Sequence, residues 1–192
     1  MKNQLNSKTL VALGLTCAMA IGSLNAAPTE ELDGGNTVVT LSATFVNALG
    51  SLTVGLADIN PARVKKGKAT FPVKSGAIDL DTLAGEIVHE GGLKLSAGST
   101  TVELIDFVID TTKPDIVLTG LVIANDSVVG RIPLFSVTLT QDAEETRNAV
   151  KIAGANLKLT SEAAGALNSV FSVKAFTAGL DVGVAAIDAK KD

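Results

Sequence analysis

Short runs of valine, isoleucine, leucine and threonine alternate with turns from Thr37 to about Leu159. Runs of this composition are typical of β-strands, and strands joined by short turns pair antiparallel with their neighbours in sequence. Clear turn signals are the segments SAGST, TTKPD and AND, each of which lies between two apolar runs. The pattern therefore predicts a mainly β fold, an antiparallel β-sandwich or meander.

The run VELIDFVI does not fit a regular strand. Val102 and Leu104 share one parity, whereas the apolar residues from Ile105 onward share the other. Because side chains alternate between the two faces of a strand, both sets cannot be buried on one face. We predict either a β-bulge near Leu104 and Ile105 or burial of both faces. The run IVLTGLVI is also apolar on both parities, which predicts a central strand between two layers.

Two segments interrupt the strand pattern. They are LSATFVNALGSLTV, from Leu41, and LTSEAAGALNSVFSV, from Leu159. In each, a leucine is followed by a hydroxyl residue that can cap a helix, Ser42 or Thr160, and then by a short amphipathic stretch. The similarity indicates an internal half-repeat of strand, short helix and strand. We expect two short helices, one near each end of the domain, packed against the sheet.

The N-terminal residues 1–26 have the features of a secretory signal peptide. Lys2 and Lys8 supply positive charge, and the apolar stretch that follows is too short to span a bilayer. We expect cleavage after Ala26, which would remove Cys17, the only cysteine. A lipid-anchored form is the less favoured alternative, because GLTC is a poor lipobox. The predicted location is therefore periplasmic or extracellular, including the cell surface.

The mature chain is expected to have two parts. Residues 27–36 are acidic and contain two glycines, which predicts a flexible leader. Residues 37–190 have the length and apolar content of a single domain with a sizeable core. No apolar run in the mature chain approaches the length of a membrane span.

Composition argues against several classes of partner. The sequence has 16 basic and 20 acidic residues, and its only basic cluster is KKGK at residues 65–68. Nucleic-acid binding needs a concentrated basic face, so nucleic acid is not expected as a partner. The chain has no Trp and no Tyr, so it lacks the flat rings with a polar edge that sugar-binding surfaces use.

Candidate catalytic and metal-binding groups are sparse. No serine lies in a Gly-x-Ser-x-Gly elbow, and no phosphate-binding glycine loop or pair of histidines occurs. Asp79 and Asp81 share one strand face and are followed by Glu86, which leaves a calcium site open as a minor alternative to an ordinary turn. We expect no enzyme activity and no metal site.

His89, in the segment GEIVHEGGLKL, is the only histidine. In a straight strand it shares the parity of Leu93 and Leu95, which places an imidazole on an apolar face. It is either a core side chain bonded to a backbone carbonyl or a polar contact in an apolar ligand pocket. Gly91 and Gly92 would let a ligand or another strand approach the backbone closely.

The segments FPVKSGAIDLDTLAGEI, from Phe71, HEGGLKL, from His89, and LTSEAAGALNSVFSVKAFTAGLDVGVAAI, from Leu159, are similar to segments of the HtaA domain family. This family consists of secreted or surface-attached modules of bacterial haem uptake. The resemblance runs from about Val39 to Asp188, as a match of pattern rather than of long identities.

The resemblance implies a non-catalytic binding domain for haem or another apolar ligand. Family members hold haem with a tyrosine on the early helix, assisted by a histidine. The histidine position is kept as His89, and Phe45 matches a family phenylalanine, but the tyrosine position falls on about Ala48. The candidate ligand-binding residues are His89, Phe45, Leu49 and Leu93.

The alternative is a structural or adhesive cell-surface protein without a small-molecule ligand. It is motivated by the scarcity of aromatic residues and by strands that are apolar on both faces. Under this hypothesis the partners are further copies of the chain or a surface receptor. Under the first hypothesis the partner is haem or another apolar small molecule.

Overall fold

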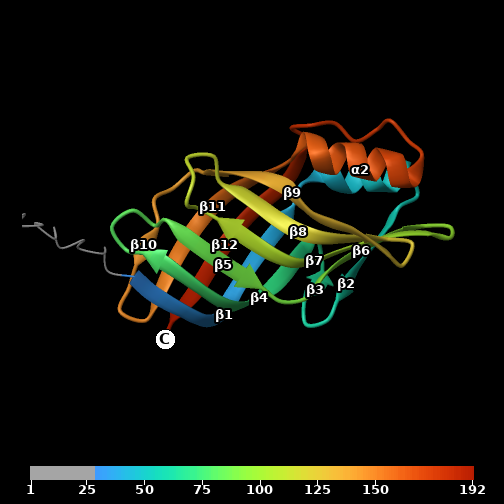
Figure 1. The fold of residues 1–192 in the computed structure, drawn as a ribbon. Helices are drawn as coiled ribbons and strands as arrows, with labels where there is room; N and C mark the ends of the chain where they lie inside the picture. The colour runs from blue at the N-terminus through green and yellow to red at the C-terminus, as the bar shows by residue number, and fades with distance from the viewer. Residues whose placement is uncertain (1–28) are drawn as a thin grey trace, which may run out of the picture.

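The computed structural model describes residues 29–192 (Figure 1), so the predicted signal peptide lies outside the described residues. This part of the chain contains two helices, α1 (Ala43–Ser51) and α2 (Ser161–Phe171). It contains twelve strands, which are β1 (Thr29–Leu41), β2 (Gly55–Ile59), β3 (Arg63–Lys65), β4 (Lys68–Asp79), β5 (Gly85–His89), β6 (Gly92–Ala97), β7 (Thr100–Asp110), β8 (Val117–Ala124), β9 (Ser127–Leu139), β10 (Glu144–Glu145), β11 (Ala149–Leu159) and β12 (Asp181–Lys191).

Eight of the strands form a closed antiparallel barrel (Figure 1). Their order around the barrel is β1, β4, β5, β7, β8, β9, β11, β12 and again β1. Strand β6 continues the line of β5 along β7 and carries β2 at its outer edge, while β3 and β10 pair with β4 and β11. The mainly β, antiparallel prediction is confirmed. The sandwich is replaced by a meander that closes through β1 and β12.

The predicted irregularity in VELIDFVI is a β-bulge in β7. The pairing with β8 shifts between Ile105 and Val108, and Asp106 adopts a φ of 53°. This extra residue returns the apolar residues to the same face, so Leu104 and Phe107 are both buried in the barrel. Strand β8 pairs with β7 and β9 on its two sides, as expected of a central strand. However, only one of its faces is buried, so it does not lie between two layers.

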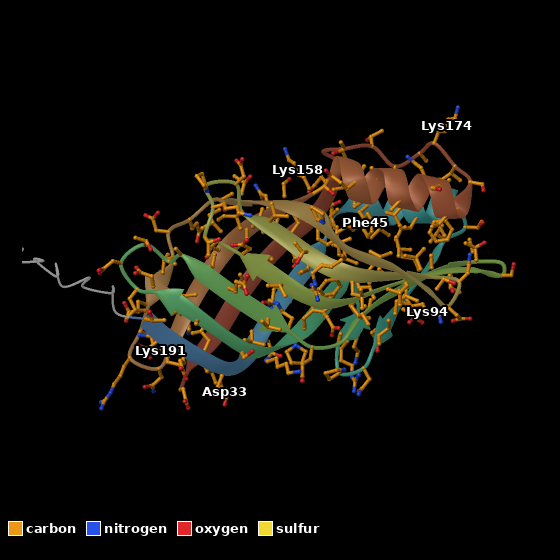
Figure 2. All side chains as sticks on the ribbon, viewed as in Figure 1. Asp33, Phe45, Lys94, Lys158, Lys174 and Lys191 are labelled. Carbon is orange, nitrogen blue, oxygen red and sulfur yellow. The ribbon has the colours of Figure 1, made fainter. Side chains whose placement is uncertain are left out.

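The prediction of a flexible leader at residues 27–36 is wrong for residues 29–36. These residues form the first part of β1, which pairs with both β4 and β12. Leu32 is buried, and Lys191 of β12 forms ion pairs with Glu30 and Glu145. Figure 2 shows Asp33 and Lys191 at the end of the barrel away from the helices. The acidic segment is ordered because it pairs with β4 and β12 and because Lys191 forms an ion pair with Glu30.

Both helices lie at one end of the barrel (Figure 1), where each begins at a hydroxyl cap. The Ser42 hydroxyl accepts a hydrogen bond from the Phe45 amide and donates one to the Asp181 carbonyl. Thr160 makes the equivalent pair of bonds at α2. Neither helix in residues 29–192 has the length and apolarity needed to cross a bilayer.

Replacing the α2 cap is expected to loosen the helix. The Thr160 hydroxyl accepts from the Ala163 amide at 3.1 Å and donates to the Pro133 carbonyl at 2.8 Å. Thr160→Ala removes both bonds and should lower the free energy of unfolding by about 1 to 2 kcal/mol. The measurement is urea unfolding followed by circular dichroism. Ser161→Ala is the control, because the Ser161 hydroxyl bonds only to the exposed Glu162 side chain. Equal losses in the two variants would contradict the capping role.

Candidate functional site

His89 ends β5 and points into the barrel, where its side chain is only 3% exposed. Its Nε2 atom lies 2.7 Å from the Thr37 hydroxyl on β1, two strands away in the barrel. Its Nδ1 atom has no hydrogen-bond partner among the described residues. The histidine is thus a buried side chain whose Nε2 atom pairs with the Thr37 hydroxyl, with the backbone carbonyls of Phe107 and Ile87 also near the ring.

The enclosure of His89 determines its protonation. Burial lowers the pKa of the imidazole from 6.5 to about 4, and the carbonyl groups of Phe107 and Ile87 offset only part of this effect. At neutral pH the ring is therefore uncharged, with one nitrogen protonated and the other free to accept. In this state His89 is not a cation, and its hydrogen bond with Thr37 links β5 to β1 inside the apolar barrel.

The four candidate residues from the sequence are all buried, and three of them line the same space. Phe45 and Leu49 are buried on α1, and Leu93 is buried on β6. Phe45, His89 and Leu93 line one space inside the barrel, the barrel cavity, whereas Leu49 does not. The barrel cavity measures about 40 Å³, which is room for a water molecule or two. Pockets for small-molecule ligands measure about 300 to 1,000 Å³, so the barrel cavity alone does not hold one.

A larger apolar space, the helix pocket, lies between α2 and the adjoining parts of β6, β7, β8 and β9. It measures about 230 Å³, and Ala163, Ala166, Leu167 and Val170 of α2 form its helical side. Ser169 supplies the only polar side chain in its lining. An apolar cavity of about 150 Å³ takes up benzene, so the helix pocket is large enough for a small apolar ligand.

The rim of the helix pocket is unusually apolar. Val129 lines the pocket and is 55% exposed, and its neighbour Val128 is 69% exposed. Both follow the tight turn at Asn125 and Asp126, two residues with positive φ that reverse the chain between β8 and β9. Val128 and Val129 thus form a small exposed apolar surface beside the helix pocket.

The outer wall of the barrel carries a separate polar cleft beside His89. Its charged residues are Lys74, Glu90, Asp106 and Arg131. Lys74 and Glu90 form an ion pair at 3.8 Å, and the Arg131 guanidinium donates to the Asp106 carbonyl oxygen at 2.7 Å. Three of the four charges are thus used in contacts within the wall, which favours a structural role.

Asp79, one of the acidic residues singled out in the sequence, stabilises a turn, whereas Glu86 lies on β5. An oxygen of the Asp79 carboxylate accepts hydrogen bonds from the Asp81 amide and from the amide and hydroxyl of Thr82. The Thr82 bonds lower the pKa of Asp79. Within residues 29–192, no three carboxylate, histidine or cysteine side chains are grouped so as to hold a metal ion.

Comparison with solved structures identifies the fold. The C-terminal domain of HtaA from Corynebacterium glutamicum superposes with a TM-score of 0.68 at 14% identity, over 85% of this chain and 99% of that one. The fold is HtaA-like. The N-terminal domain of the same protein gives a TM-score of 0.64 at 14% identity, over 84% and 98% of the two chains. The haem-binding protein HtaB from that organism gives 0.55 at 11% identity, over 86% and 96%. No family model and no curated protein matches the sequence.

The residues of this HtaA-like chain do not fit a haem held through its iron. Iron in haem proteins is ligated by histidine, cysteine, methionine or tyrosine. Residues 29–192 contain no Tyr, Cys or Met, and their one histidine, His89, is enclosed in the barrel with Nε2 bound to Thr37. The helix pocket has no ionisable side chain in its lining that could ligate iron or pair with a propionate.

Sequence reasoning found the buried histidine but missed the helix pocket. The face of α2 that lines the helix pocket includes Ala163 and Ala166, and its apolar residues are spaced as in any helix that packs on a core. The available signal was the size of these residues, because alanines leave space where leucines would fill it. Phe45 is the one sequence candidate that lines the pocket, and Figure 2 shows it where the helices meet the barrel.

Proposed function

We propose that this chain is a non-catalytic binding domain that holds an apolar ligand in the helix pocket without iron ligation. The observation that carries the proposal is the pocket itself, a recess of about 230 Å³ with one hydroxyl and no ionisable group in its lining. Apolar contact is the only strong interaction that such a lining offers. The likeness to the haem-binding protein HtaB supports a binding role for the fold.

The surroundings of His89 support the non-catalytic part of the proposal. A nucleophilic triad needs a serine and a carboxylate in line with the imidazole. The hydrogen-bond partner of His89 is instead Thr37, and the remaining lining of the barrel cavity is aliphatic or phenylalanine. Export through residues 1–26, and self-association or a surface receptor, stay predictions from the sequence.

Binding in the helix pocket is tested with a small neutral fluorophore. N-phenylnaphthylamine should gain fluorescence when it is titrated with the protein. Ala166→Phe places a ring in the pocket and should weaken binding at least about tenfold. Gly165→Ala is the matched control, because it lies on the open side of the same helix with nothing within 4 Å of the added methyl group. Equal binding by both variants would place the fluorophore elsewhere.

Haemin provides the second arm of this test. Without an iron ligand, the wild type and His89→Ala should both leave the Soret band of haemin unshifted. A shift in the wild type that disappears in His89→Ala would mean that the barrel opens and that His89 binds the iron. That result would overturn the proposal in favour of haem binding through histidine.

A further inference from the structure

The helix pocket and the barrel cavity are separated by a thin apolar partition. Four side chains line both spaces, and all of them are buried: Phe45, Leu95, Leu104 and Phe135. No polar atom of a side chain stands between the two spaces at this place. The partition therefore divides what would otherwise be one apolar channel from α2 into the barrel.

The space behind the partition is lined mainly by aliphatic and phenylalanine side chains, with three alanines among them. Ala69, Ala155 and Ala185 face the barrel cavity from β4, β11 and β12. Alanines at these positions leave space that larger side chains would fill. The only polar side chains of this lining are Thr37 and His89, which are bonded to each other.

Phe45 differs from the other three members of the partition in how it is held. Leu95, Leu104 and Phe135 belong to strands whose backbones pair with neighbours on β7, β8 and β11. Phe45 belongs to α1, a helix of nine residues. A rotation of its ring, or a small shift of α1, leaves every strand ladder intact. Phe45 is thus the member that can move at least cost.

This geometry restricts the chemistry of the ligand. Polar groups that enter the pocket would lose water and find only Ser169 as a partner. A ligand that reaches beyond the helix pocket must also pass between the side chains of the partition. A thin aliphatic chain is suited to this path, because it needs no polar partner and little width.

We infer that Phe45 sets how deeply an aliphatic chain in the helix pocket reaches toward the barrel. This inference rests on the proposed function of the helix pocket. In the wild type the chain occupies the helix pocket and ends at the Phe45 ring, with its polar end at the valine rim. When a smaller side chain replaces Phe45, the chain continues into the barrel.

The test is a chain-length series of octanoate, decanoate and dodecanoate that displace N-phenylnaphthylamine from the purified protein. The wild type should bind the three with similar affinity, because methylenes that do not fit between the Phe45 ring and the valine rim stay in water. Phe45→Leu and Phe45→Ala should bind the longer acids more tightly, by about fourfold for each methylene that enters the barrel. Circular dichroism confirms that each variant is folded, and Phe45→Leu keeps a core side chain if Phe45→Ala does not fold.

The control is Val46→Ala, the next residue on α1, which is 45% exposed and lines neither space. It should leave the chain-length series unchanged. If the wild type binds the acids and Phe45→Leu shows the same dependence of affinity on chain length, the inference is wrong and the proposed function stands. Absence of any binding, by the fluorophore or the acids, would overturn both. Affinity that already rises with chain length in the wild type would show that Phe45 is no barrier.

Discussion

Gly91→Ala is expected to lower the free energy of unfolding by about 3 to 4 kcal/mol, through backbone strain and a steric clash together. Gly91 lies between β5 and β6, two residues after His89, with a φ of +79°. A Cβ atom at this position would lie 2.4 Å from the Ala62 amide nitrogen and 2.7 Å from the Ile59 carbonyl oxygen. Both contacts are with backbone, which cannot move aside as a flexible side chain would.

Urea unfolding followed by far-ultraviolet circular dichroism measures this loss, since the chain has no tryptophan or tyrosine for fluorescence. Gly98→Ala is the matched control, because Gly98 has a φ of +57° in the turn between β6 and β7 but nothing within 4 Å of its Cβ position. It should lose only about 1 kcal/mol, from the left-handed conformation alone. Equal losses in the two variants would mean that close packing at Gly91 contributes nothing.

The sequence was sufficient for the strands and their order but not for the closure of the sheet. Alternation and turn signals are local, so neighbouring strands such as β7, β8 and β9 could be read in order. The closing pair is β1 and β12, in which Thr37 lies opposite Ile187 at the other end of the chain. A pairing between distant segments leaves no trace in local alternation. The acidic leader was misread for the same reason, because Leu32 is its only large apolar residue and its partners are distant strands.

The candidate site was predicted in part. Strand parity placed His89 on an apolar face, and the structure puts it in the barrel interior. Its partner Thr37 could not be predicted, because the contact crosses the barrel from a strand that is not adjacent to β5. The helix pocket is a volume left by packing, and volume depends on how α2 sits on the barrel. A helical pattern shows which face is apolar but not how much space that face leaves.

His89 should make the protein lose stability as the pH falls. The folded-state pKa of about 4 lies below the 6.5 of the exposed imidazole, so the unfolded chain takes up a proton that the folded chain does not. The loss begins as the pH falls through about 6.5 and levels off below about 4. The difference between the two pKa values corresponds to about 3 kcal/mol at full development. The measurement is the free energy of unfolding in urea at a series of pH values.

His89→Gln separates this contribution from that of the carboxylates. Glutamine retains a hydrogen-bonding group toward Thr37 but does not titrate. Hydrogen bonds from Thr82 and Thr112 lower the pKa values of Asp79 and Asp110, so these carboxylates also stabilise the fold less in acid. This loss is the same in the wild type and in His89→Gln. The advantage of the wild type over His89→Gln should therefore shrink by about 3 kcal/mol between about pH 7 and about pH 4. A difference that stays constant over this range would show that the imidazole is protonated, or open to water, in the folded barrel.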